Sequence, residues 1–281
     1  MIEAATDDRP IGMFDSGFGG LTVARAFIDL LPDEDLVYVG DTGRYPYGPR
    51  SLDEVAGFAH EIARYLVDEH DVKLLVVACN TAAAAALGSL REVLDVPVMG
   101  VIDPGVRSLV RATETGRVGV IGTVGTVGSG AYQRAVASSG ASVDLTVAAC
   151  PGFVEFVEGG ETDGDQVHVL AERLLAPVVE AKVDALLLGC THYPYLARTI
   201  TDVVGRDVVL VSSADETAFE ALAMFHQKAP APDEPALAPA AAGRAGTHRF
   251  VSSGDVDRFR DLGARLLGPE LAAAERAPWS P

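Results

Sequence analysis

Two cysteines follow apolar runs of the kind that form buried strands. Lys73 to Ala83 reads KLLVVACNTAA and Val183 to Tyr193 reads VDALLLGCTHY, so Cys79 and Cys190 occupy the same place in two similar segments. A continuous apolar run is typical of a parallel strand, and ligands of open α/β sheets bind at the carboxyl ends of such strands. Both thiols are therefore expected at a functional site, although a buried core cysteine is the simpler alternative for either one alone.

Paired thiols suit a reaction that needs one acid–base group on each face of a carbon atom. A cysteine hydrolase requires one thiolate, one base and an oxyanion site, and it leaves the second thiol unexplained. An unperturbed thiol titrates near ~8.5, so a helix N-terminus can give a useful thiolate fraction at neutral pH. The pattern therefore favours proton removal on one face and proton delivery on the other. Neutral hydroxyl and backbone N–H donors at helix N-termini would hold a substrate carboxylate.

The chain that positions these thiols reads as two repeats of the same α/β order. The other strands expected are Ile11 to Phe14, Leu36 to Val39 and Val96 to Ile102 in the first repeat, and Arg117 to Ile121, Val143 to Ala149 and Val208 to Val211 in the second. The offset between equivalent strands is nearly constant, which indicates an internal duplication. The predicted fold is two pseudo-symmetric α/β lobes with mostly parallel sheets and an active site in the cleft between them.

The first lobe is expected to comprise residues 1–102 and 212–281, and the second lobe residues 103–211. Residues 229–245 alternate Pro and Ala without an apolar period, which predicts a linker or surface loop with nothing packed against the core. A strand at 248–253 and a capped helix, Asp255 to Leu267, are predicted to return to the first lobe. The last dozen residues are predicted to be frayed.

Composition limits the classes of partner and the compartment. The net charge is −18, which argues against nucleic-acid backbones and anionic membranes as partners. Three cysteines in 281 residues suit a reducing compartment better than a disulfide framework. The acidic N-terminal stretch predicts no signal peptide, and no apolar run is long enough for a membrane span. We expect a cytoplasmic protein, with a homodimer as an open alternative to a monomer.

Cofactor and metal motifs are weak in this sequence. The turn from Gly17 to Thr22, GFGGLT, resembles a dinucleotide fingerprint but lacks its third glycine. Cys190 and His192 stand two residues apart, and one such pair makes a poor metal site. We expect neither a cofactor nor a metal.

Several motifs together resemble the bacterial glutamate racemases of the cofactor-independent aspartate/glutamate racemase superfamily. They are Phe14-Asp15-Ser16-Gly17, Pro46-Tyr47-Gly48-Pro49, Cys79-Asn80-Thr81-Ala82, Gly122-Thr123 with Thr126, Cys150-Pro151 and Cys190-Thr191-His192-Tyr193-Pro194. They run in order from about residue 11 to residue 215. The resemblance implies cofactor-independent interconversion of L- and D-glutamate, which supplies D-glutamate for peptidoglycan synthesis.

The resemblance also implies roles for individual residues. Cys79 would take the α-proton of D-glutamate with help from Asp15, and Cys190 that of L-glutamate with help from His192. The positions that match substrate contacts are Asp15, Ser16, Tyr47, Gly48, Asn80, Thr81, Thr123, Thr191 and His192. Asp41 and Glu158 match acidic residues near the site.

Other interpretations stay open at this point. Asp15 could only cap a helix, Tyr47 could only pack, and His192 could be a structural residue. The substrate could be aspartate, because the motifs fix the chemistry at the α-carbon better than the side-chain pocket. A cysteine amidase that uses Cys190 and His192 would leave Cys79 dispensable, and a two-lobed binding protein would need neither thiol.

Overall fold

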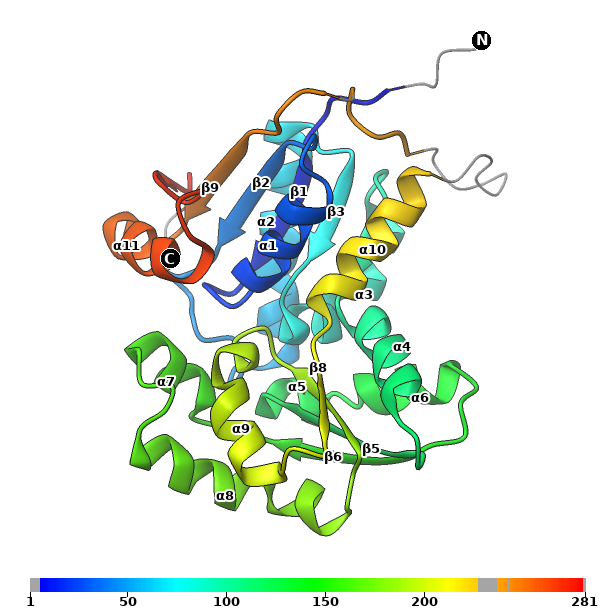
Figure 1. The fold of residues 1–281 in the computed structure, drawn as a ribbon. Coiled ribbons are helices and arrows are strands. Elements are labelled where there is room, and N and C mark those ends of the chain that lie inside the picture. Colours follow the sequence, from blue (N-terminus) through cyan, green and yellow to red (C-terminus); the bar gives the residue numbers. More distant parts are fainter. Residues whose placement is uncertain (1–5, 227–236, 242, 280–281) are drawn as a thin grey trace.

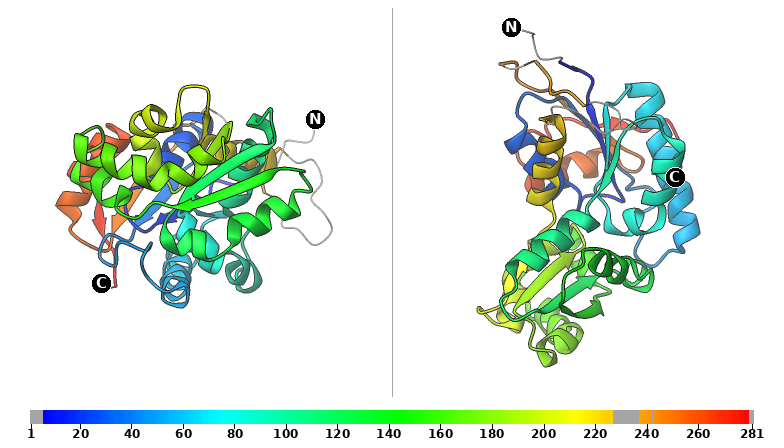
Figure 2. Two further views of the ribbon diagram at one scale, coloured as in Figure 1. Left: turned by 90° about the horizontal axis from the view of Figure 1, so that it is seen from below. Right: turned by 90° about the vertical axis from the view of Figure 1, so that its right-hand side faces the viewer.

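The computed structural model describes residues 6–226, 237–241 and 243–279, and it folds into two α/β lobes (Figure 1). One lobe carries a six-stranded sheet and the other a four-stranded sheet. Seen from the side, the lobe with the N-terminus stands above the lobe formed by the middle of the chain (Figure 2). The predicted fold class is therefore confirmed.

The two sheets repeat one strand order. The first sheet is ordered β10-β9-β2-β1-β3-β4 and the second β6-β5-β7-β8, and all pairs are parallel. The strands are β1 (Ile11–Asp15), β2 (Leu36–Gly40), β3 (Leu74–Val77), β4 (Val98–Gly100), β5 (Arg117–Gly122), β6 (Asp144–Ala149), β7 (Ala185–Gly189), β8 (Val209–Val211), β9 (His248–Ser252) and β10 (Glu275–Arg276). The order β2-β1-β3-β4 thus recurs as β6-β5-β7-β8, as a duplication requires.

Helices connect the strands and cover both faces of each sheet. They are α1 (Leu21–Leu30), α2 (Leu52–His70), α3 (Asn80–Val93), α4 (Ile102–Ala112), α5 (Val124–Gly128), α6 (Ala131–Ser138), α7 (Phe153–Gly159), α8 (Asp165–Glu180), α9 (Ala197–Val204), α10 (Ala214–Phe225) and α11 (Val256–Leu267), with a 3₁₀ turn, η1 (Tyr193–Leu196). Among the described residues, none of these helices is both long and apolar enough to cross a membrane.

Alternate residues of the buried strands pack into different hydrophobic cores on the two faces of each sheet. On the first sheet, Ile11 and Met13 pack with α1, α10 and α11, whereas Phe14 packs with α2 and α3. The second sheet packs against α7, α8 and α9 on one face and against α4 and α6 on the other. The core under α4 and α6 is continuous with the core under α2 and α3, so apolar packing joins the lobes.

Two expectations about local structure were wrong. The run from Val96 to Ile102 holds only the short strand β4, because Ile102 already begins α4. The C-terminal residues are not frayed as far as they are described: β10 pairs with β9, Leu271 is fully buried, and Trp279 packs edge-on against Tyr65. Apolar side chains therefore fix this tail to the first lobe.

The Pro/Ala segment is also more than a surface loop. Residues 227–236 and 242 lie outside the described part of the chain. Residues 237–241 form no helix or strand, yet Ala240 is buried and donates its N–H to Glu34 at 2.8 Å. The carbonyl of Ala238 accepts a hydrogen bond from the buried Lys73 at 3.1 Å. The expectation that nothing here is packed is wrong for these five residues.

Candidate active site

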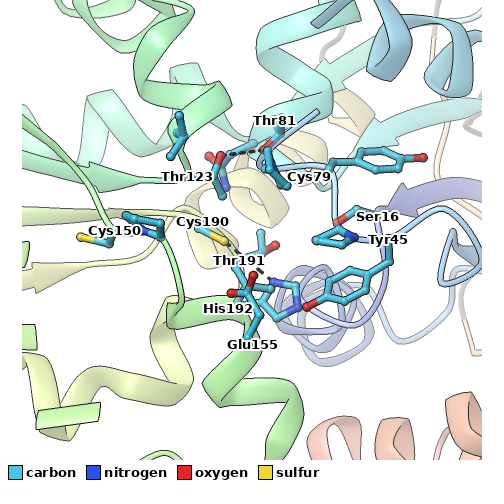
Figure 3. A pocket seen from close by; sticks show the side chains of 18 of the residues that line it. Ser16, Tyr45, Cys79, Thr81, Thr123, Cys150, Glu155, Cys190, Thr191 and His192 are labelled. Atoms are coloured by element: carbon cyan, nitrogen blue, oxygen red, sulfur yellow. Dashed lines mark hydrogen bonds between the residues drawn. The ribbon is translucent and has the colours of Figure 1, made fainter. Parts of the chain in front are cut away.

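One cavity lies where the carboxyl ends of the two sheets meet (Figure 3). It has a volume of about 90 Å³, which is room for several water molecules. The residues that line it are Asp15, Ser16, Tyr45, Pro46, Tyr47, Gly48, Pro49, Cys79, Asn80, Thr81, Thr123, Val124, Cys150, Pro151, Gly152, Val154, Glu155, Cys190, Thr191 and His192. Both predicted thiols and all nine predicted substrate-binding positions therefore line a single pocket.

Cys79 stands between β3 and α3, as the residue that caps the N-terminus of the helix. Its sulfur accepts a hydrogen bond from the N–H of Ala82 at 3.5 Å. Burial, with a smaller contribution from the charge of Asp15, raises the pKa of this thiol to about 12. Cys79 is therefore a protonated thiol at neutral pH, able to give a proton to a bound molecule.

Cys190 follows β7 and lies beside a histidine. The distance from Cys190 Sγ to His192 Nδ1 is 3.8 Å, and His192 Nε2 lies 3.1 Å from Glu158 Oε1. Burial opposes protonation of His192, but the hydrogen bonds to Cys190 and Glu158 raise its pKa to about 10. The imidazole is therefore a cation at neutral pH, and it faces the sulfur with one nitrogen and the carboxylate with the other.

Asp15 ends β1 and is completely buried. Its carboxylate accepts hydrogen bonds from the N–H of Gly17 at 2.8 Å and from the hydroxyl of Thr191 at 3.2 Å. Burial raises its pKa, and the neighbouring His192 opposes that rise. The N–H of Gly20, the N-cap residue of α1, also opposes this rise, so Asp15 interacts with the start of α1 as well as with Thr191.

Three threonine hydroxyls join the lobes at the opposite side of the pocket. Thr81 Oγ1 lies 3.0 Å from Thr123 Oγ1 and 3.1 Å from Thr126 Oγ1. Thr123 also accepts a hydrogen bond from the N–H of Thr126 and so caps the short helix α5. These hydroxyls are neutral donors of the type that the sequence predicts for holding a carboxylate.

Two glycines allow the lobes to approach each other. A Cβ atom on Gly19 would lie 2.3 Å from His192 Nδ1, and one on Gly48 would lie 3.0 Å from the Cβ of Thr123. The carbonyl of Gly48 also accepts a hydrogen bond from the N–H of Gly125 at 2.9 Å. Side chains at these positions would push the two walls of the pocket apart.

The two acidic residues that the resemblance places near the site have different positions. Glu158 is buried against His192. Asp41 lies behind the pocket wall, where it accepts hydrogen bonds from the hydroxyl of Tyr47, from Arg44 at 2.8 Å and from Ser253 at 2.5 Å. Asp41 therefore supports the Tyr47 loop and does not line the cavity.

Sequence analysis missed some residues that line the pocket. Tyr45, Val124, Val154 and Glu155 lie in loops and short helices and carry no local pattern that marks them. Within the described ranges, no group of three or more His, Cys, Asp or Glu side chains could hold a metal ion.

Two parallel-sheet lobes, each with a cysteine after its third strand, define a class of α/β proteins with paired thiols at one site. Comparison with known proteins identifies the family within this class. The model of the Asp/Glu/hydantoin racemase family matches residues 21–221. The chain belongs to this family, which confirms the resemblance found in the motifs.

Individual relatives are similar over nearly the whole chain. A glutamate racemase of Acidothermus cellulolyticus is 52% identical over 262 residues, covering 93% of this chain and 96% of the relative. The crystal structure of a glutamate racemase isoform of Bacillus anthracis is 41% identical, with a TM-score of 0.86 and 95% and 96% coverage. A glutamate racemase of Francisella tularensis in complex with D-glutamate is 31% identical, with a TM-score of 0.86 and 96% and 97% coverage.

Proposed function

We propose that this chain interconverts L- and D-glutamate without a cofactor, with Cys79 and Cys190 as its two acid–base groups. The observation that carries the proposal is the equivalence of the two thiols: each follows the third strand of its lobe, and both line the same cavity. A carbon atom held between them would have one thiol on each face. Such a site removes a proton from one side and delivers one to the other.

The protonation states of the two sides fit such a transfer. The pKa of Cys79 is raised to about 12, so this sulfur carries a proton. On the other side, the imidazolium of His192 faces the sulfur of Cys190, with Nδ1 at 3.8 Å from Sγ. In this state Cys190 would take the α-proton of L-glutamate while Cys79 gives a proton to the opposite face. In the reverse reaction Cys79 would take the α-proton of D-glutamate, and Cys190 would give a proton to the opposite face.

The substrate would be held by neutral donors. No lysine or arginine is among the described residues that line the cavity. Hydroxyls of Ser16, Thr81, Thr123 and Thr191 and the N-terminus of α3 supply donors instead. Donors placed at the α-carboxylate stabilise the carbanion character that develops as the weakly acidic α-proton leaves.

The relatives support glutamate as the substrate, because the similar proteins named above are glutamate racemases and one of them holds D-glutamate. The product would serve peptidoglycan synthesis. A mechanism that needs both thiols reduced suits the cytoplasm, which we propose as the compartment. All three cysteines are free in the structure.

Isotope labelling at low conversion tests the two-base mechanism. The reaction is run from L-glutamate in deuterated water, stopped at low conversion, and the enantiomers are separated for mass spectrometry. We expect deuterium at the α-carbon of the D-glutamate formed, because its new hydrogen comes from Cys79, which exchanges with solvent. Unreacted L-glutamate should stay unlabelled. Product without label, beyond the residual light water, would show that one base serves both faces.

Two controls separate this function from its alternatives. Circular dichroism that follows loss of optical activity from L-aspartate and from L-glutamate tests the side-chain preference, and faster loss of the aspartate signal would assign the chain to aspartate. Glutamine incubated with the enzyme tests the cysteine amidase. Release of ammonia that survives replacement of Cys79 would favour the amidase.

A further inference from the structure

A tyrosine outside the cavity links the segments that carry the two thiols. Tyr132 lies near the start of α6 in the second lobe and is 1% exposed. Its hydroxyl donates a hydrogen bond to Oδ1 of Asn80 in the first lobe, at 2.6 Å. Asn80 directly follows Cys79, so this contact reaches the first catalytic segment from the opposite lobe.

The ring of Tyr132 packs against the other segment. A Cβ atom added to Gly189 would lie 2.9 Å from Cε2 of the ring and 3.1 Å from Cζ. Gly189 directly precedes Cys190, and its lack of a side chain leaves the space that the ring fills. Tyr132 therefore contacts one residue beside each thiol.

Only one of the two polar atoms of the Asn80 side-chain amide forms a hydrogen bond within the described part of the chain. Its oxygen is held by Tyr132, whereas its nitrogen Nδ2 is buried and has no hydrogen-bond partner in the described part of the chain. Asn80 is one of the residues that line the cavity. A buried donor without a partner destabilises the site, so a ligand that accepts a hydrogen bond from it would remove that penalty.

We propose that Tyr132 is a positioning residue for the racemase site: it holds the Asn80 amide so that Nδ2 donates to a carboxylate oxygen of the bound amino acid. This inference rests on the proposed function and adds a residue to it. An amide turned the other way would present its oxygen to an anionic ligand, which is repulsive. By holding Oδ1, the tyrosine hydroxyl selects the productive orientation before the substrate arrives.

Burial keeps the Tyr132 hydroxyl protonated. Loss of solvation raises the pKa of this side chain, and the nearby Cys190 raises it further. The hydroxyl is therefore available as a donor throughout the pH range in which the enzyme would work. Phenylalanine at this position would keep the ring against Gly189 but leave the amide free to turn.

The sequence makes this contact unusually easy to observe. Asn80 is the only asparagine in the 281 residues. Protein labelled with ¹⁵N-asparagine at both nitrogens gives one backbone amide signal and one pair of signals from the two protons of the side-chain amide. Racemic glutamate is added, because turnover does not change its composition. We expect the side-chain protons to shift and to exchange more slowly with solvent as glutamate saturates the site.

The backbone signal of Asn80 separates two kinds of failure. A backbone shift without a side-chain response would overturn the role of Nδ2 while leaving the proposed function standing. No response of either signal, together with no racemisation, would overturn both. This measurement uses the unaltered protein and does not depend on whether any variant folds.

A double-mutant cycle then assigns the effect to Tyr132. Tyr132→Phe should lower kcat/KM for glutamate about tenfold in the native background, the effect of one lost buried hydrogen bond. In an Asn80→Ala background the same change should cost less than about twofold, because the amide it positions is gone. Equal losses in both backgrounds would reduce Tyr132 to a packing residue and overturn the proposal.

Tyr193→Phe is the matched control. Tyr193 is a fully buried tyrosine of the second lobe whose hydroxyl donates to the carbonyl of Cys150 at 3.0 Å. Its replacement also removes one buried hydroxyl, but this hydroxyl has no contact with Asn80. We expect its effect on kcat/KM to be the same with and without Asn80→Ala. Coupling of Tyr193 to Asn80 as strong as that of Tyr132 would contradict a specific positioning role.

Discussion

Thr191 donates its hydroxyl to Asp15 across the two lobes, with an oxygen–oxygen distance of 3.2 Å. Both side chains are buried. Asp15 ends β1 beside Cys79, and Thr191 directly follows Cys190. The contact therefore ties the carboxylate that influences one thiol to the segment that carries the other.

Replacing Asp15 tests this electrostatic connection. The charge of Asp15 contributes to the raised pKa of Cys79, so Asp15→Asn should lower that pKa. Alkylation of Cys79 by iodoacetamide, followed by peptide mass spectrometry, should then begin at lower pH. We also expect kcat/KM to fall by on the order of 10²-fold, because an acid–base group near the substrate is lost.

Thr191→Val is the control for Asp15→Asn, because it removes the contact between the lobes and keeps the carboxylate. Its alkylation profile at Cys79 should stay close to that of the unaltered protein. An unchanged profile in Asp15→Asn would show that the carboxylate does not act on Cys79.

Replacing either thiol of the pair should stop racemisation in both directions. We expect Cys79→Ser and Cys190→Ser each to lower turnover by on the order of 10³-fold or more, because every turnover uses both groups. The enantiomers have equal free energies, so kcat/KM must fall equally from either side. Circular dichroism of both reactions measures this, with far-ultraviolet spectra to confirm folding.

Cys150→Ser provides an internal comparison. Cys150 is buried and lines the same cavity, and burial raises its pKa to about 12, as for Cys79. It follows β6, however, and so has no equivalent among the paired third strands. We expect a much smaller loss of turnover. A loss as large as that of Cys190→Ser would place a third thiol in the reaction.

The raised pKa of His192 predicts how stability depends on pH. The folded protein holds the proton up to a pH of about 10, whereas an unfolded histidine loses it near ~6.5. The folded state thus binds more protons between these values, and the stabilisation from His192 falls as pH rises through this window. The stabilisation from His192 is fully present below the pKa of an unfolded histidine, near ~6.5.

Urea unfolding of the protein and of His192→Asn across that window measures this contribution. The free energy of unfolding should decline less steeply with pH in the variant. The difference between the two curves isolates His192 from other groups, such as the buried thiols, that titrate at high pH in both proteins. Parallel curves would mean that His192 is neutral in the folded state.

Much of the site could be predicted from the sequence because its main residues follow strand ends. Apolar runs before Cys79 and Cys190 indicate two buried strands, and the repeat of this pattern indicates that the strands are equivalent. Parallel strands that end at one edge of a sheet bring their next residues together. Asp15 and Thr123 follow the same rule at the ends of β1 and β5.

Other contacts depend on packing that local patterns do not encode. Tyr132 reaches Asn80 only because α6 lies against the end of β7, and neither helix nor tyrosine has a distinctive spacing. Asp41 meets Ser253 because β9 pairs with β2, far apart in the sequence. The buried C-terminal tail escaped prediction because single apolar residues such as Leu271 form no period.

A buried ion pair helps to hold residues 237–241, which the sequence predicts to be part of a loop. Lys73 Nζ lies 2.6 Å from Glu34 Oε2, and the two side chains are 0% and 5% exposed. The ammonium also donates to the carbonyls of Asp7 at 2.6 Å and Ala238 at 3.1 Å. One cation thus binds the N-terminal segment and residues 237–241 to the start of β3.

Lys73→Met should therefore lower the free energy of unfolding by about 3–5 kcal/mol, because it leaves Glu34 buried without its partner. Adding Glu34→Gln should recover part of this loss by removing the uncompensated charge. The exposed pair Arg249–Glu275, whose side chains are 50% and 53% exposed, provides the matched control. Arg249→Met should cost less than about 1 kcal/mol. Urea unfolding that gives similar losses for Lys73→Met and Arg249→Met would show that the buried pair does not hold residues 237–241 in place.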